Sequence, residues 1–132
     1  MAFVYNRTIP TVAQFTDLYR ACTLGARRPL DAAAEMMANV NLILSAWDGD
    51  LLVGLARAMT DRVQATYLAD LAVRETHQKH GIGKQLIRMV QAEAPRALVV
   101  LIAAPQAHEY YGRIGFAQHR SCWILRPEMT LS

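Results

Sequence analysis

The amino-acid sequence predicts a mixed α/β fold in which a mostly antiparallel central sheet contains one parallel strand–helix–strand unit. Two strand-forming runs flank an Asp-Gly turn, which is typical of an antiparallel hairpin. Further along, an apolar strand, a glycine-bearing loop, an amphipathic helix and a second apolar strand follow one another, which is typical of a right-handed parallel crossover. With 132 residues, 53% of them apolar and 19% charged, the chain suits a single domain over residues 1–132.

The N-terminal part predicts one strand and two helices. Residues 3–9 are rich in β-formers and stop at Pro10, which predicts the first strand. Thr11 is a suitable N-cap for an amphipathic helix that ends near residue 23. Asp31 is a candidate cap for a second short helix that ends near residue 39. We expect residues 25–39 to form a lid.

The central part predicts the hairpin and the crossover unit. Residues 41–47 and 51–60 are the hairpin strands on either side of the Asp-Gly turn. Residues 65–73 form a long central strand, and Asp70 interrupts its apolar sequence. A loop over residues 74–83 then leads into a helix over residues 84–93, which Pro95 ends.

The C-terminal part predicts two strands around a short helix. Residues 98–103 are almost continuously apolar, so we expect a buried strand parallel to the preceding one. Residues 107–114 form a helix that Gly115 stops, and residues 116–125 return as a strand. A homodimer through these C-terminal strands is a further expectation.

Composition argues against several classes of protein. The first seven residues lack a charged region followed by an apolar stretch, so we expect a cytoplasmic protein. The longest apolar run, residues 97–105, is too short to cross a membrane. Cys22 and Cys122 have no metal-ligand spacing, so no metal is expected. A net charge of +3, without a basic stripe that includes aromatic residues, disfavours nucleic acid as a partner.

The strongest chemical signal lies in the loop between the central strand and its helix. Gly81 and Gly83 allow the main chain to approach a ligand closely, and the following helix presents unpaired N–H groups and its positive dipole end. These features favour a diphosphate. The glycine spacing fits neither a P-loop nor a dinucleotide-binding fingerprint, because Lys84 is followed by Gln85 and no third glycine is present.

Two ordered motifs instead resemble those of the GNAT N-acetyltransferase superfamily. Gln78-x-x-Gly81-x-Gly83, after a strand that ends in Leu-Ala-Val, resembles its acetyl-CoA signature. The segment from Ala107 to Phe116, Ala-His-Glu-Tyr-Tyr-Gly-Arg-Ile-Gly-Phe, resembles its Ala-x-x-aromatic-Tyr-x-x-x-Gly-Phe segment. The predicted order of elements also resembles the superfamily's fold over nearly the whole chain. One departure is Ala104-Pro105, where many members carry an asparagine three residues before the motif alanine.

The resemblance implies a binding site for acetyl-CoA, with no metal. Backbone groups near Leu71 and Val73 would pair with the pantetheine arm, and amides of residues 78–84 would hold the diphosphate. The implied contact residues are Leu71, Ala72, Val73, Gln78, Lys79, His80, Gly81, Ile82, Gly83 and Lys84. The alternative interpretation of the basic residues is that they only solvate a surface loop, as charge runs usually do.

The resemblance further implies an N-acetyltransferase that acts on the primary amine of a small molecule by direct transfer in a ternary complex. Tyr111 matches the tyrosine proposed as general acid, although it could instead only pack against the coenzyme. Asp70 is a candidate base or ammonium ligand, because a carboxylate in an apolar strand is costly unless it is paired or functional. His108 and His119 are weaker candidates for the base.

The acceptor is not specified by these motifs. Arg27 and Arg28 could bind an acceptor carboxylate or phosphate, but solvated arginines are the commoner case. Trp47 and Trp123 are first expected in a core or an interface and only second in an acceptor site. The alternatives to a small-molecule enzyme are a protein or peptide acetyltransferase and a non-catalytic CoA-binding sensor.

Overall fold

The computed structural model describes residues 2–22, 24 and 27–132. The chain divides into two compact units, Met1–Ile102 and Ala103–Ser132, each with its own internal contacts. The first unit contains a five-stranded sheet in which each strand lies beside its sequence neighbour, in the order β1-β2-β3-β4-β5. The first three pairings are antiparallel and the last is parallel, which confirms the predicted sheet.

The first two elements follow the sequence pattern closely. Strand β1 spans Val4–Asn6, which is shorter than the predicted 3–9, and helix α1 spans Val12–Arg20. The Thr11 hydroxyl accepts a hydrogen bond from the Gln14 N–H, and the Gln14 side chain accepts one from the Thr11 N–H. This reciprocal pair is a capping box, so the prediction that Thr11 caps the helix is confirmed.

The second helix begins differently from the prediction. A 3₁₀ turn, η2, spans Leu30–Ala32, and helix α2 spans Ala33–Ala38. Asp31 lies inside the 3₁₀ turn and no side chain caps α2, so the predicted Asp31 cap is wrong. The tight turn places Asp31 too early in the chain to reach the first N–H groups of α2. Positions 25 and 26 of the predicted lid lie outside the described residues.

The hairpin and the central strand match the predicted positions. Strands β2, Leu42–Asp48, and β3, Leu51–Thr60, are joined at Gly49, whose φ of +59° is the left-handed conformation that glycine adopts without strain. Strand β4, Ala65–Val73, pairs with β3 in antiparallel register. The hairpin prediction and the bounds of β4 are therefore confirmed.

The crossover unit is also confirmed, with shifted ends. After the short 3₁₀ turn η3, Glu75–His77, helix α3 spans Ile82–Glu93 and begins two residues before the predicted start at Lys84. Strand β5, Leu98–Val100, runs parallel to β4, but the expectation that it is buried is wrong, because Leu98 and Val100 are exposed. It ends before the predicted residue 103 because its pairing with β4 stops at Val100.

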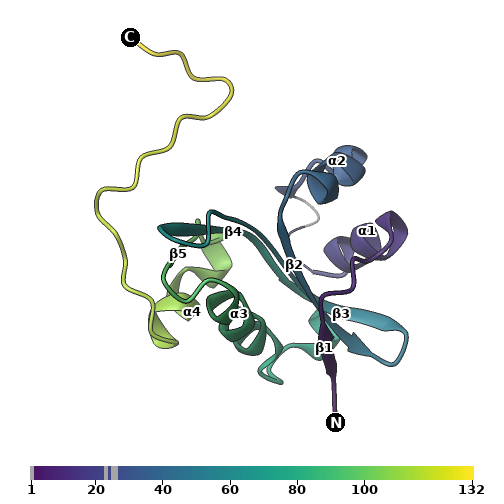
Figure 1. Cartoon of the computed structure of the whole chain (residues 1–132). Coiled ribbons are helices and arrows are strands. Elements are labelled where there is room, and N and C mark those ends of the chain that lie inside the picture. Colours follow the sequence, from purple (N-terminus) through teal and green to yellow (C-terminus); the bar gives the residue numbers. More distant parts are fainter. Residues whose placement is uncertain (1, 23, 25–26) are drawn as a thin grey trace. The chain divides into compact units, whose positions relative to one another are not determined.

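Helices cover both faces of the sheet in the first unit (Figure 1). Leu55 of β3 packs in a core cluster with Phe15 and Leu18 of α1. Its neighbour Gly54 points the other way, because successive strand residues face opposite sides. A Cβ at Gly54 would lie 2.7 Å from the Ile82 Cγ2 atom of α3. The glycine thus allows α3 to lie directly on the sheet.

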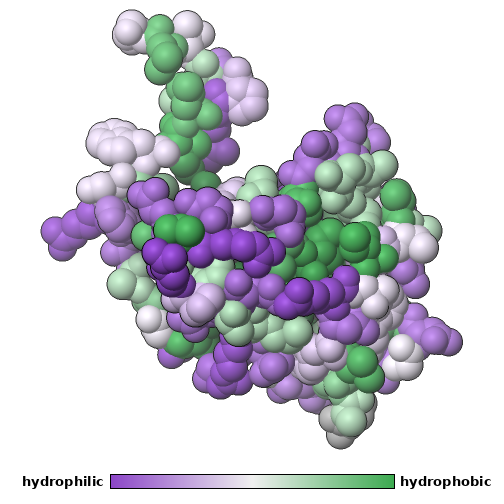
Figure 2. Space-filling view, in the orientation of Figure 1, coloured by the Kyte–Doolittle hydropathy of each residue, from purple (hydrophilic) through white to green (hydrophobic). Residues whose placement is uncertain are grey.

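The second unit contains a 3₁₀ turn, η4, Pro105–Ala107, and helix α4, His108–Arg113. The predicted strand over residues 116–125 is wrong, because these residues have no strand pairing. Its β-formers favour an extended chain, but a strand also needs a neighbour for its backbone groups. Trp123 is 92% exposed, and apolar side chains lie along this exposed terminal segment (Figure 2).

The close approach at Gly54 gives a first prediction. Gly54→Ala should lower the free energy of unfolding by about 1–3 kcal/mol, because the added methyl group crowds the stiff, branched Ile82 side chain. Urea unfolding followed by circular dichroism measures the change. The control is Gly112→Ala in α4, where an added Cβ meets no atom within 4 Å and a helix gains from alanine. Equal effects of the two substitutions would contradict the role given to Gly54.

Candidate functional site

Strand β4 has one edge that is only partly paired. It pairs with β3 as far as Val73, but with β5 only from Ala65 to Tyr67. In the part of the chain that the structure describes, no strand pairs with the β5-side edge of β4 beyond Tyr67. Leu71, Ala72 and Val73 lie in this stretch, so an extended ligand could hydrogen-bond to the backbone there.

The end of β4 is held in place by Arg74. Its N–H donates to the Val53 carbonyl at 2.9 Å, and its guanidinium donates to the Leu52 carbonyl and to Asp17. The next basic residue, His77, contacts the Asp48 carboxylate at 2.9 Å through Nε2. Arg74 and His77 therefore fix the start of the loop to the fold.

The loop then turns sharply into α3. Lys79 and Gly81 both have positive φ, +67° and +77°, and Gly81 occupies the N-cap position of α3. No side chain caps this helix, so its first N–H groups face outward without a side-chain acceptor. A Cβ at Gly81 would meet no atom within 4 Å, which shows open space beside the backbone. This arrangement is suited to an anion.

The side chains around this turn divide into anchoring and exposed groups. Ile82 is buried against β3, and the Gln78 side-chain amide donates to the Val73 carbonyl at 3.2 Å. Lys79, His80 and Lys84 have exposed side chains, and Gly83 lies in the first turn of the helix. The predicted loop residues are thus brought to one helix end, with three basic side chains exposed beside it.

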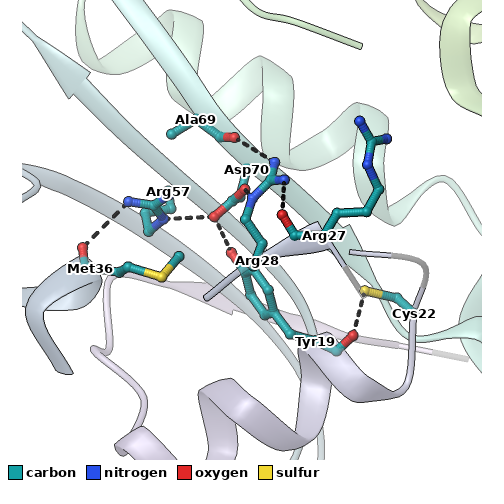
Figure 3. Close-up of polar contacts among 8 residues, drawn as sticks. All are labelled: Tyr19, Cys22, Arg27, Arg28, Met36, Arg57, Ala69 and Asp70. Carbon is teal, nitrogen blue, oxygen red and sulfur yellow. Dashed lines mark hydrogen bonds and ion pairs between the residues drawn. The ribbon is translucent and has the colours of Figure 1, made fainter. Parts of the chain in front are cut away.

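A buried charge cluster lies on the other side of the sheet, around Asp70 (Figure 3). Asp70 is 2% exposed. One of its oxygens accepts from Arg28 Nε at 2.6 Å, and the other accepts from Arg57 Nε at 2.7 Å and from the Tyr19 hydroxyl at 2.7 Å. Both oxygens of the carboxylate are therefore engaged by strong donors.

A bulge in β4 sets this arrangement. Arg57 lies directly opposite Asp70, whereas the next pair along is Ala58 with Leu68, which leaves Ala69 as an extra residue. Sequence alternation alone identified Asp70 as unusual but gave no partners. The pairing register supplies Arg57, helix α1 supplies Tyr19, and the segment before η2 supplies Arg28.

The ionisation of the cluster follows from its burial and charges. Burial, followed by the charge of Asp70, strongly raises the pKa of Tyr19, so this phenol stays protonated and acts as a donor. Burial alone would lower the pKa of Arg57, but attraction to Asp70 outweighs it and the pKa is raised. Arg57 therefore keeps its positive charge.

Tyr111 belongs to the second unit, in α4. Its ring makes edge contacts with Tyr110 and Phe116, with centroids 5.2 and 5.4 Å away. Burial and, to a smaller extent, Tyr110 raise the pKa of Tyr111 to about 12. The phenol is therefore protonated at neutral pH and can donate a proton or a hydrogen bond.

The other sequence candidates are dispersed. His108 is exposed, and His119 Nδ1 accepts from the Ser121 N–H at 3.0 Å. The Trp47 indole N–H donates to the Ser45 hydroxyl at 3.0 Å, while the Arg27 side chain points away from Asp70 (Figure 3). Two surface hollows, of about 490 and 450 Å³, are lined by neither the loop nor the cluster.

Comparison with protein families decides the assignment of the chain. Residues 22–122 match the model of the acetyltransferase (GNAT) domain, which is well over half of the sequence. The chain belongs to the GNAT acetyltransferase family. No curated protein matches the sequence. The GNAT match includes both motifs, from Gln78 to Gly83 and from Ala107 to Phe116.

Solved structures show the same GNAT fold. A GNAT family protein from Streptococcus pneumoniae is similar over 95% of this chain and 98% of its own, with a TM-score of 0.74 and 23% identity. An aminoglycoside N-acetyltransferase in complex with CoA is similar over 97% of this chain and 96% of its own, with a TM-score of 0.73 and 17% identity. A ribosomal-protein-alanine N-acetyltransferase from Brucella melitensis biovar Abortus is similar over 95% of this chain and 98% of its own, with a TM-score of 0.70 and 17% identity.

The described residues form neither a cluster of metal ligands nor a membrane-spanning helix. Outside the undescribed positions 1, 23, 25 and 26, no group of three or more His, Cys, Asp or Glu side chains is placed to hold a metal ion. Over the same residues, every helix is too short or too polar to cross a membrane.

The Asp70 cluster gives a second prediction. Asp70→Asn should lower the free energy of unfolding by roughly 3–5 kcal/mol, because it leaves two guanidinium groups without their shared counter-charge. The control is Asp17→Asn, which removes the exposed carboxylate that pairs with Arg74 and should cost less than about 1 kcal/mol. Chemical denaturation of both variants measures the difference. Similar losses would show that the cluster contributes no more than a surface pair.

Proposed function

We propose that this protein is an N-acetyltransferase that transfers an acetyl group from acetyl-CoA to the primary amine of a small molecule. The observation that carries the proposal is the uncapped N-terminus of α3 behind Gly81, beside the open edge of β4. The diphosphate of acetyl-CoA suits the exposed N–H groups, Lys79 and Lys84 add positive charge, and the exposed His80 adds a polar side chain. The pantetheine amides suit the edge of β4 near Leu71 and Val73, where no described strand pairs with it.

The reaction joins the acceptor nitrogen to the thioester carbonyl carbon and breaks the carbon–sulfur bond. The nitrogen loses one proton and the departing thiolate gains one. A primary ammonium with a pKa near 10.4 must first be deprotonated, which costs roughly 4.6 kcal/mol at about pH 7. A site that favours the neutral amine therefore accelerates transfer.

Tyr111 is the proposed donor to the departing sulfur. A phenol with a pKa of about 12 is a weaker acid than a thiol of about 8.5, so full proton transfer to the thiolate would be uphill by roughly 5 kcal/mol. Tyr111 therefore acts best as a hydrogen-bond donor that stabilises the charge developing on sulfur. Asp70 stays a candidate base, although its carboxylate already accepts three hydrogen bonds, from Tyr19, Arg28 and Arg57.

Direct transfer in a ternary complex fits the cysteines. Neither Cys22 nor Cys122 lies in a sequence motif typical of a nucleophilic thiol, and the Cys22 thiol donates to the Tyr19 carbonyl. Two of the three similar structures are named as acetyltransferases of different acceptors, an aminoglycoside and a ribosomal protein, so the fold is compatible with either class. We favour a small acceptor because the polar groups around Asp70 are buried, which suits an enclosed site better than an open peptide groove.

Coenzyme binding is the first test. Calorimetric titration with acetyl-CoA should show binding by the wild-type protein. A Gly81→Asp/Gly83→Asp double variant should bind acetyl-CoA at least about 100-fold more weakly, because carboxylates at this helix end repel the diphosphate. The control is Asp50→Gly, which changes an exposed position in the turn between β2 and β3. No binding by folded wild-type protein would overturn the proposal.

Tyr111→Phe tests the donor. The substitution should lower kcat by about 100-fold or more, with the affinity for acetyl-CoA changed less than about two-fold, because only the transition-state hydrogen bond is lost. In the wild type, kcat should not fall between about pH 8 and pH 10 through this group, since a phenol with a pKa of about 12 remains protonated there. Tyr110→Phe is the matched control. An equal kcat for Tyr111→Phe and wild type would assign Tyr111 to packing.

A further inference from the structure

The Asp70 cluster contains more positive than negative charge. Arg28 and Arg57 are both cationic, and Asp70 is the one carboxylate that pairs with either of them among the described residues. Tyr19 is neutral, because burial and Asp70 raise its pKa. The cluster therefore has a net charge of about +1 by the ordinary charges of these groups.

This excess charge is shielded from water. The Arg57 side chain is 11% exposed and that of Arg28 is 24% exposed. A guanidinium that is largely removed from water is costly unless a counter-charge or good acceptors surround it. A single carboxylate shared by two arginines meets this requirement only in part.

The outer nitrogens of both guanidinium groups pair with no carboxylate among the described residues, because Asp70 is engaged through Nε. Arg57 Nη1 reaches the Met36 carbonyl at 3.4 Å, and its guanidinium also lies within hydrogen-bonding reach of the Tyr19 hydroxyl. The Nη atoms of Arg28 reach the Arg27 and Ala69 carbonyls at 3.2 and 3.4 Å. Each arginine thus uses Nε for Asp70 and keeps weakly bonded N–H groups at the other end of its fork (Figure 3).

We propose that Arg57 and Arg28 bind a carboxylate on the acceptor, so that the acceptor is a small amine that also carries a carboxylate group. This inference rests on the proposed function, because it names the substrate class of that same reaction. The planar fork of arginine matches two carboxylate oxygens, and one bound carboxylate would bring the net charge of the cluster to zero. A phosphate dianion would overcompensate the single excess charge.

The position of the cluster is consistent with this role. Asp70 precedes Val73 by three residues on the same strand, a separation of roughly 10 Å at the rise of a β-strand. The open edge of β4 proposed to hold the pantetheine arm includes Val73. An amino acid whose carboxylate lies at the cluster can therefore direct its amine along the strand.

A purely structural cluster is the competing explanation. In that case an ion pair with one arginine and a hydrogen bond from Tyr19 would be enough to stabilise Asp70. The second arginine would then add only an uncompensated positive charge. Substrate recognition gives the second arginine a purpose. The two explanations differ in what they predict for ligands, because a structural cluster has no preference between a carboxylate and a carboxamide.

The test compares matched amines that differ in one group. A panel of α- and ω-amino acids and their carboxamides is measured in two ways with the full chain: equilibrium binding by calorimetry with CoA present, and thiol release from acetyl-CoA. We expect at least one carboxylate to bind about 10–100-fold more tightly than its carboxamide, as for a charge-assisted hydrogen-bonded pair. Thiol release should show the same preference in kcat/KM.

Two arginine variants assign the preference to the cluster. Arg28→Gln leaves Asp70 bonded to Arg57 and Tyr19, so the fold should persist. The affinities for a carboxylate and its carboxamide should then differ by less than about three-fold. Arg57→Lys keeps the charge but removes the fork and should weaken carboxylate binding. The control is Arg27→Gln, whose exposed side chain points away from Asp70 and should leave the preference intact. Circular dichroism verifies the fold of each variant.

The outcomes separate this inference from the proposed function. Acetyl-CoA binding and thiol release with equal or better use of carboxamides would overturn the carboxylate site alone. Carboxylate-selective binding without thiol release would support the site and contradict the transferase. Failure of every carboxylate in the panel to bind, or a preference that survives Arg28→Gln, would overturn the inference.

Discussion

The hydrogen bonds and ion pairs of the buried Asp70 carboxylate tie helix α1 and the segment before η2 to the sheet. Helix α1, strand β3 and the segment before η2 each send one donor to it, so three parts of the chain far apart in sequence meet at one buried charge. Such a cluster contributes little net stability compared with an apolar core, because the burial of charge is costly. Its presence in a central strand is better explained by what its excess positive charge can bind.

Strand β4 connects this cluster to the loop over residues 74–83, which we propose to bind acetyl-CoA. Its bulge at Ala69 places Asp70 opposite Arg57, and its unpaired edge begins where β5 ends. On the other face of the sheet, Gly54 admits α3 close to β3, and the buried Ile82 fixes the first turn of that helix. The backbone amides after Gly81 are thus rigidly positioned by apolar packing, which suits a site that must hold a charged ligand without reorganising.

Local sequence signals predicted most of the first unit. The capping box at Thr11, the turn at Gly49 and the glycines before α3 are short-range features, whose physical causes lie within a few residues. The same kind of reasoning failed for Asp31 and for residues 116–125. A cap depends on the turn geometry before the helix, and a strand depends on a neighbour, and neither is encoded by the preference of a residue alone.

The sequence by itself determined the family motifs, the order of the elements and the loop that is suited to a diphosphate, because backbone conformation and helix ends follow from local residue types and spacing. Only the tertiary structure decided that Arg28, Arg57 and Tyr19 surround Asp70. Those four side chains are brought together by strand register, a bulge and the packing of α1, which are contacts between residues as much as 51 positions apart. The sequence therefore identified an unusual acid, and the fold supplied its chemistry.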